Sequence, residues 1–281
     1  MTRSGSAAGL VLPASILVFA GLALPLTLLF RYSLNRFVPG QFMVEALTLE
    51  NYVKALTDPY YAQVMGTTIA VAGSVTLICL VAGFPAAYFL ARMRSRWKSA
   101  LVMLVVLPLF VGNAVRAAGW MVLFGQKGLI NATLDALGLD PVTLIYTPTA
   151  VVIGVTAVNL PFMVLTLQSV IEGIEPAVEE AALSLGANPI ATFLKVTLPL
   201  ALPGVLAGVI LVFILGMNAY ATPILLGGPR FQMMAPVVFN QIAGQSNWPF
   251  GATLAFILMA ATLALTIISN LIVRRRYAGR R

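Results

Sequence analysis

The sequence predicts an all-α protein that crosses a membrane six times, and three observations support this fold class. Of the 281 residues, 60% are hydrophobic and only 9% are charged, whereas a soluble domain carries about 25% charged residues. The mean hydropathy is +0.96. Six apolar stretches are each long enough to cross the hydrocarbon core as a helix, which takes about 20 residues. Backbone groups in lipid must pair within their own segment, so these stretches are predicted to be helices.

The predicted spans cover, in chain order, about residues 10–30, 65–91, 100–124, 147–170, 201–224 and 250–273, all within one transmembrane domain, residues 1–281. The first apolar run is longer than the 7–15 residues of a typical signal-peptide core, so it is predicted to stay uncleaved. Charged residues delimit the other five: the second ends at Arg92, the third begins after Lys98, the fourth ends before Glu172, the fifth follows Lys195 and the sixth ends before Arg274.

The composition excludes most enzymatic chemistry. The chain has no histidine and a single cysteine, Cys79, so a Ser-His-Asp or Cys-His nucleophile, a histidine-ligated metal site and an internal disulfide are all excluded. A phosphate-binding G-x-x-x-x-G-K-[ST] loop is missing too, so ATP has to be bound elsewhere. The chain is therefore predicted to be neither an enzyme nor a metal-binding protein.

The basic residues predict the orientation of the spans. Four of them, Arg92, Arg94, Arg96 and Lys98, lie between the second and third spans, and five more follow the sixth span. Lys and Arg are enriched in cytoplasmic loops, so both termini are predicted to be cytoplasmic. The net charge of +8 is interpreted as contact with anionic lipid headgroups rather than with nucleic acid.

The loop at residues 171–200 breaks this charge pattern, because it carries four glutamates against Lys195 alone. Pro176 suits the start of a helix, and Glu179 and Glu180 suit its first turn. An apolar stripe with alanines at its centre follows this start, and Gly186 is predicted to end the helix. Asn188-Pro189 then suits a turn into a second short helix, and Leu198-Pro199 leads into the fifth span.

Two interpretations of this helix-turn-helix remain open. Such short helices are not stable alone, so they either pack on this chain's own helix ends or dock on a separate cytoplasmic partner. In the second case Glu180 would offer a charge-assisted hydrogen bond to an Arg or Lys of that partner.

The same loop carries a family resemblance. Glu180-Ala181-Ala182, then Gly186 after three residues, then Val196-Thr197-Leu198-Pro199 after nine more, resembles the EAA signature of inner-membrane permease subunits of binding-protein-dependent ABC importers. Val196 departs from the isoleucine that is usual in the family. Residues 107–131, 145–176 and 221–229 resemble the first permease subunit of spermidine/putrescine-type transporters. That branch also includes permeases for phosphonates, opines and iron.

The resemblance implies a type I ABC importer permease fold in the bacterial inner membrane and a set of partners. These are a second permease subunit, two ATPase subunits that bind ATP and Mg²⁺, and a periplasmic solute-binding protein, with no cofactor in this chain. The helix of the 171–200 loop would then be the coupling helix that docks on an ATPase subunit. Its coupling residues would be Glu179, Glu180, Ala181, Ala182, Leu185 and Gly186, with Pro199 beyond it.

Polar residues within the spans are candidates for a solute path, because strongly polar groups are costly in lipid. Thr156 and Asn159 share one face of the fourth span, and Asn218 and Tyr220 lie toward the outer end of the fifth. Hydrogen bonding between helices is the alternative for each of them. Arg116 is the only ionisable residue clearly inside a span. It is either a functional group or a side chain that snorkels to the interface.

The predicted function is one half of the path of an ATP-driven importer for a small polar solute, most simply a polyamine. None of the six spans contains Asp or Glu, so acidic groups for a polyamine would have to come from the partner permease or the binding protein. A phosphonate, opine or iron substrate is the alternative within the family. An ion-coupled secondary transporter is the alternative from another class, although its usual midplane ionisable groups and inverted repeats are not evident.

Overall fold

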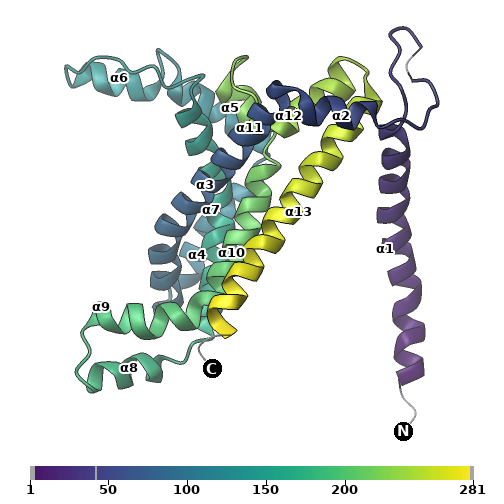
Figure 1. Cartoon of the computed structure of the whole chain (residues 1–281). Coiled ribbons are helices and arrows are strands. Elements are labelled where there is room, and N and C mark those ends of the chain that lie inside the picture. Colours follow the sequence, from purple (N-terminus) through teal and green to yellow (C-terminus); the bar gives the residue numbers. More distant parts are fainter. Residues whose placement is uncertain (1–3, 42, 279–281) are drawn as a thin grey trace. The chain divides into compact units, whose positions relative to one another are not determined.

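The computed structural model describes residues 4–41 and 43–278. Within that part of the chain the regular structure is helical, apart from an isolated antiparallel bridge between Arg36 and Val44 (Figure 1). Five helices of the described chain are long and apolar enough to cross a membrane, and the number rises to six if one bent pair counts as a single span. The predicted all-α fold class with multiple spans is therefore confirmed, while the cytoplasmic placement of both termini stays a prediction.

The long helices are α1 (Ser4–Ser33), α3 (Pro59–Arg92), α7 (Pro148–Glu172), α10 (Leu198–Met217) and α13 (Trp248–Ala278). The shorter elements are α2 (Glu50–Thr57), α4 (Lys98–Val106), η1 (Leu107–Phe110), α5 (Asn113–Phe124), α6 (Leu129–Ala136), α8 (Pro176–Ser184), α9 (Pro189–Thr192), η2 (Phe193–Thr197), α11 (Ala221–Gly227), α12 (Met234–Phe239) and η3 (Asn240–Gly244). Four predicted spans, 10–30, 65–91, 147–170 and 250–273, fall on α1, α3, α7 and α13.

The predicted span at 100–124 differs from the structure, where the segment is broken. Lys98–Phe110 and Asn113–Ala136 meet at a bend of 95°. Pro108 has no N–H to continue the hydrogen bonding of α4, and the chain tightens into the 3₁₀ turn η1 before Val111 becomes extended at φ −88° and ψ 126°. Arg116 therefore lies on α5, beyond the bend, and not inside a straight third span.

The predicted span at 201–224 is also interrupted. α10 ends at Met217, and Tyr220 has left the helical region with φ −121° and ψ −65° before α11 begins at Ala221. A helix running on through Pro223 would lose the hydrogen bond to the carbonyl of Ala219 and would bring the proline ring against it. Residues 218–220 therefore lie outside regular helix, and all three line a cavity, a place where interrupted helices are tolerated in membrane proteins.

The chain forms two compact units, Met1–Ala62 with Val237–Met259, and Gln63–Pro236 with Ala260–Arg281. In the first unit, the end of α1 is fixed by polar contacts. The Ser33 carbonyl accepts hydrogen bonds from Thr253 Oγ1 at 3.2 Å and Asn51 Nδ2 at 3.0 Å. Phe30 and Phe256 add an edge-to-face ring contact with centroids 5.4 Å apart.

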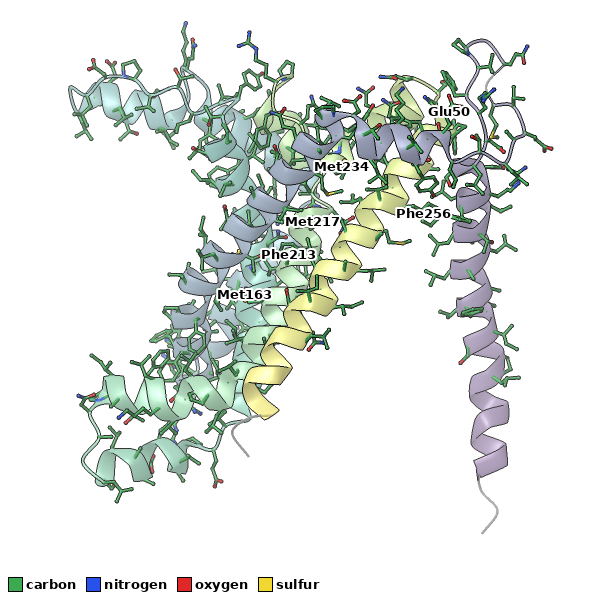
Figure 2. The ribbon with its side chains drawn as sticks, in the orientation of Figure 1. Glu50, Met163, Phe213, Met217, Met234 and Phe256 are labelled. Carbon is green, nitrogen blue, oxygen red and sulfur yellow. The ribbon has the colours of Figure 1, made fainter. Side chains whose placement is uncertain are left out.

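The second unit is built around close packing of α7 against α10. Met163 of α7 is fully buried (Figure 2), and it fills the space above Gly83 of α3 and Gly208 of α10. A Cβ added at Gly204 would come within 2.7 Å of the Cβ of Val170. Gly204 and Gly208 thus form a small-residue face of the kind that lets membrane helices approach closely.

Candidate functional site

The segment predicted to couple the chain to a partner forms two short helices, α8 and α9, at one end of the second unit (Figure 1). Gly186 ends α8 with φ +89°, a left-handed conformation that glycine adopts without strain. The N–H of Ala187 donates to the carbonyl of Ala182 at 3.1 Å, and the N–H of Gly186 donates to Leu183 at 3.0 Å. This pair of bonds is a Schellman motif. Asn188 then caps α9 by accepting from the N–H of Ala191 at 2.7 Å.

The two helices carry an apolar surface that the chain leaves exposed. α8 has no fully buried residue, and Leu185 at its end is 89% exposed. Ala181 is exposed and Ala182 half-buried. The other exposed apolar side chains of this surface are Val178, Leu183, Ile190 and Leu194. The surface favours the interpretation that α8 docks on a separate partner, and we call it the coupling surface.

The two neighbouring glutamates of α8 face in different directions. Glu180 is exposed, as expected of a residue that meets a partner. Glu179 is turned inward, with its side chain only 12% exposed, and pairs with Arg92 at 2.7 Å. Both glutamates are predicted to be coupling residues, but only Glu180 has an exposed side chain.

Hydrogen bonding sets the charge state of Glu179. Burial alone would raise the pKa of its carboxyl, but donors from Arg92, Thr197 and Tyr88 and the positive charge of Arg92 outweigh burial and hold the pKa below its ordinary value. Glu179 is therefore ionised at neutral pH.

A second ion pair explains more of the charge exception in the loop. Glu172, at the end of α7, pairs with Lys98 at 2.9 Å and accepts a hydrogen bond from Gln168 at 2.9 Å. Two of the four glutamates are thus paired with residues of the basic 92–98 segment. Part of the negative charge of the loop therefore neutralises the basic segment of the same chain. The sequence pattern does not reveal this pairing, because the two segments are far apart along the chain.

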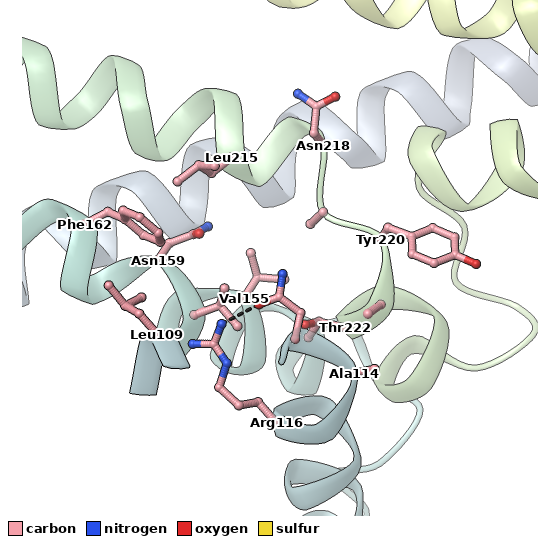
Figure 3. Close-up of a pocket in the computed structure, with 14 residues that line it drawn as sticks. Leu109, Ala114, Arg116, Val155, Asn159, Phe162, Leu215, Asn218, Tyr220 and Thr222 are labelled. Atoms are coloured by element: carbon pink, nitrogen blue, oxygen red, sulfur yellow. Dashed lines mark hydrogen bonds between the residues drawn. The ribbon is translucent and has the colours of Figure 1, made fainter. Parts of the chain in front are cut away.

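Four of the five predicted path residues line one cavity in the second unit, with a volume of about 650 Å³ (Figure 3). Arg116 of α5, Asn159 of α7, and Asn218 and Tyr220 between α10 and α11 all line it. The remaining lining residues are Leu109, Asn113, Ala114, Val155, Val158, Phe162, Leu215, Ala219, Ala221 and Thr222. Thr156 is not among them. It lies on α7 three residues before Asn159, and its carbonyl accepts from Cys79 Sγ at 3.7 Å.

Two residues of the lining, Asn159 and Arg116, carry buried hydrogen-bond donors that have no partner among the described residues. Asn159 is 3% exposed, and its Nδ2 has no partner among the described residues. Arg116 donates from Nη2 to Asn113 Oδ1, while its buried Nε and Nη1 have no partner in the described chain. Asn113 escaped the sequence analysis, although its position three residues before Arg116 places it on the same helix face.

The lining contains no carboxylate. Among the described residues, moreover, no group of three or more His, Cys, Asp or Glu gathers to hold a metal ion. The lining is mostly apolar, with one guanidinium and the side chains of Asn113, Asn159, Asn218, Tyr220 and Thr222 as its polar groups. A cavity of this kind has room for a small molecule and offers it both apolar and hydrogen-bonding side chains.

Comparison with known proteins agrees with this description. Residues 83–277 match the family model described as "Binding-protein-dependent transport system inner membrane component". The spermidine/putrescine transport system permease protein PotB of Haemophilus influenzae is 35% identical over 236 residues, which cover 83% of this chain and 80% of that protein. PotB of Escherichia coli K12 is 35% identical over 234 residues, covering 83% of this chain and 82% of that protein.

A solved structure shares the fold over nearly the whole length. A chain in the crystal structure of a bacterial alginate ABC transporter, in complex with an alginate-bound periplasmic protein, superposes with a TM-score of 0.75. The alignment covers 97% of this chain and 95% of that chain at 17% identity.

Proposed function

Because this chain belongs to the family of binding-protein-dependent transport system inner membrane components, a family of multi-pass inner-membrane permeases, we propose that it forms half of the path by which an ABC importer moves a polyamine-like solute. ATP and Mg²⁺ would be bound by two separate ATPase subunits. A second permease would complete the path, and a periplasmic binding protein would deliver the solute.

The observation that carries this proposal is the cavity of about 650 Å³. Its volume lies within the range of about 300–1,000 Å³ for small-molecule sites. Residues from three separate segments converge on it, and both helix breaks of the second unit lie beside it. Discontinuous helices at a polar cavity are typical of transport paths, because freed backbone groups take the place of water around the solute.

The polyamine class comes from the PotB relatives, which are named for spermidine and putrescine. Asn side-chain oxygens, backbone carbonyls beside Ala219 and the ring of Tyr220 would meet the ammonium groups. The guanidinium of Arg116 repels a cation, and the lining has no acid to compensate. We therefore expect carboxylates of the second permease to face this cavity in the assembled importer.

The coupling surface supports the proposal at the other end of the second unit. A short helix with an exposed apolar stripe is a groove-binding element, and Glu180 beside it is exposed for a charge-assisted bond. In the proposed importer, α8 docks in a groove of one ATPase subunit and follows its movement.

The test is uptake by the assembled complex. The chain is purified with its partner permease, ATPase subunits and binding protein, reconstituted in vesicles, and supplied with radiolabelled spermidine or putrescine. We expect uptake that needs both ATP and the binding protein. Uptake driven by a proton or sodium gradient without ATP would contradict the proposal, and ATP-dependent uptake of another solute alone would contradict the polyamine class.

A further inference from the structure

A compact polar cluster lies under the coupling helix α8 and joins three elements. The carboxylate of Glu179 accepts from Arg92 Nη2 at 2.7 Å and from Thr197 Oγ1 at 2.9 Å, both at Oε1, and from the hydroxyl of Tyr88 at 3.1 Å at Oε2. Tyr88 and Arg92 lie one turn apart at the end of α3, and Thr197 directly precedes α10. A single carboxylate on α8 is thus bonded to α3 and to the start of α10.

The cluster is sheltered and reinforced on its far side. The side chains of Arg92 and Glu179 are 18% and 12% exposed, and Thr197 is 1% exposed. Arg92 Nη1 also donates to the carbonyl of Ile174 at 2.8 Å, which holds the turn that precedes α8. Removing one partner of a sheltered pair costs more than breaking a surface salt bridge, because the other charge is left buried without its counter-charge.

Beyond Glu179, α8 packs only against its sequence neighbours η2 and α9 among the element pairs with substantial contact in the described chain. The helix has no fully buried residue, and its apolar side chains are exposed except for the half-buried Ala182. Glu180, the next residue, points to solvent. Among the described residues, the side-chain hydrogen bonds that join the first turn of α8 to α3 and to the start of α10 are those of Glu179.

We propose that the Glu179–Arg92 cluster is the mechanical joint of this permease, through which displacement of α8 is passed to α3 and α10. Glu179 and Arg92 are positioning residues: they touch neither solute nor ATP. This inference rests on the proposed function and assigns different roles to the two neighbouring glutamates. Glu180 and the coupling surface hold the ATPase, and Glu179 connects that contact to the helices of the second unit.

The physical reason is rigidity. A helix held by one polar joint at its first turn moves with its neighbours as long as the joint holds, because a three-donor carboxylate has a single favourable geometry. When the Glu179 carboxylate loses its charge, α8 still docks on the ATPase subunit but moves independently of α3 and α10. ATP is then hydrolysed without moving the path.

The test compares Glu179→Gln with the adjacent Glu180→Gln as a matched control in the reconstituted importer. For Glu179→Gln we expect ATPase activity to persist while solute transported per ATP hydrolysed falls by about tenfold, the effect of losing one charge-assisted hydrogen bond. For Glu180→Gln we expect transport and ATPase activity to fall together, with their ratio unchanged. A wild-type ratio in Glu179→Gln would overturn the joint, as would a proportionate loss of both activities.

Thr197→Val serves as a milder variant if Glu179→Gln impairs assembly. It removes one donor and leaves the ion pair, and we expect a smaller fall in the same ratio; an unchanged ratio would count against the joint. The wild-type complex distinguishes a failure of the proposed function from a failure of the joint. If it shows no ATP-driven uptake, the proposed function fails; if it transports and both variants keep its ratio, only the joint fails.

A distance measurement between spin labels tests the joint independently of transport and ATPase activity. Spin labels at Ser184 of α8 and at Ser95, both exposed, give the distance between α8 and the segment that follows α3, and native Cys79 is fully buried. We expect a narrow distance distribution in the wild type and a broad one in Glu179→Gln, with Glu180→Gln unchanged. A narrow distribution in Glu179→Gln would overturn the joint.

Discussion

At the scale of single residues, Asn159 and Glu179 show how a polar group gains a role from what surrounds it. Asn159 is buried in an apolar helix bundle with its Nδ2 unpartnered among the described residues, and it faces a cavity. Leaving a buried donor unsatisfied costs about 1–3 kcal/mol. A group that carries this cost at the wall of a cavity is therefore a candidate for contact with a solute. Glu179 is the opposite case, since its carboxylate is satisfied by three donors of the same chain.

Asn159→Leu is therefore expected to slow uptake by about tenfold, because the cavity loses a polar contact with the solute. Thr156→Val is the matched control on the same helix, since Thr156 does not line the cavity. Initial rates of polyamine uptake at equal amounts of assembled complex would measure both variants. Equal rates in the two would remove Asn159 from the path.

The ion pair of Glu179 also predicts a pH dependence. Its carboxyl has a pKa below the ordinary value in the folded chain, so the ionised form contributes stability that is fully present above the ordinary carboxyl range. This stability is lost as pH falls through the lowered pKa. The distance distribution between labels at Ser95 and Ser184 should be constant from pH 8 to about 5 and broaden only at more acid pH. In Glu179→Gln it should be broad throughout, and broadening already near pH 7 in the wild type would contradict the assignment.

At the scale of elements, a glycine has a different role in each of two helices: Gly186 ends α8, and Gly204 allows α10 to pack closely on α7. Gly186 supplies the positive φ that turns the chain from α8 toward α9. Gly204 supplies space where α10 meets α7, because an added Cβ would meet the branched side chain of Val170 at 2.7 Å. The first glycine is needed for its backbone conformation and the second for its lack of a side chain.

Gly186→Pro is expected to abolish solute-stimulated ATP hydrolysis while the subunit stays inserted. Proline is fixed near φ −65° and has no N–H to donate to Leu183, so the end of α8 is lost. Gly186→Asn is the control, since asparagine adopts the left-handed conformation at low cost. ATPase assays with and without loaded binding protein separate the two, and full stimulation in Gly186→Pro would argue against coupling through α8.

Gly204→Ala is expected to lower the thermal stability of the purified complex, because overpacking a close helix contact costs about 1–3 kcal/mol. Gly73→Ala on α3 is the matched control, since nothing lies within 4 Å of a Cβ added there. Thermal unfolding in detergent would measure both. A Gly204→Ala variant as stable as Gly73→Ala would show that α7 and α10 have room to separate.

At the scale of the whole molecule, the charged residues have two roles: basic residues indicate the orientation in the membrane, and some of them form ion pairs within the chain. The basic 92–98 segment predicts the cytoplasmic side, and the structure pairs two of its members with glutamates of the following acidic loop, as Arg92–Glu179 and Lys98–Glu172. The basic segment and the acidic loop therefore lie together at one end of the second unit.

Cysteine labelling tests this orientation. Variants with a single added cysteine at Ser95 or Ser184 should be protected from a membrane-impermeant maleimide added to spheroplasts, whereas Thr133→Cys on α6 should react. All three positions are exposed, and native Cys79 is fully buried and should stay silent. The reverse pattern would show that the termini and the coupling surface face the periplasm.

Much of the fold was accessible from the sequence, because hydropathy and charge act locally. The apolar runs found α3, α7 and α13, and Pro176, Gly186 and Asn188 placed the turns of α8 and α9. The breaks before α5 and α11 were missed although Pro108 and Pro223 mark them. Composition alone does not distinguish a proline that kinks a membrane helix from one that ends it, since neighbouring helices decide whether the freed backbone is satisfied.

The sequence by itself determined that this protein is a multi-span membrane permease and which loop carries the family signature, because composition and short motifs need no long-range contacts. Only the tertiary structure decided that Arg116, Asn159, Asn218 and Tyr220 share one cavity while Thr156 does not. It also decided that Glu179 faces inward and Glu180 outward. Those outcomes depend on which helix faces meet, and residues as distant in the chain as Arg92 and Glu179 become partners only when the helices pack.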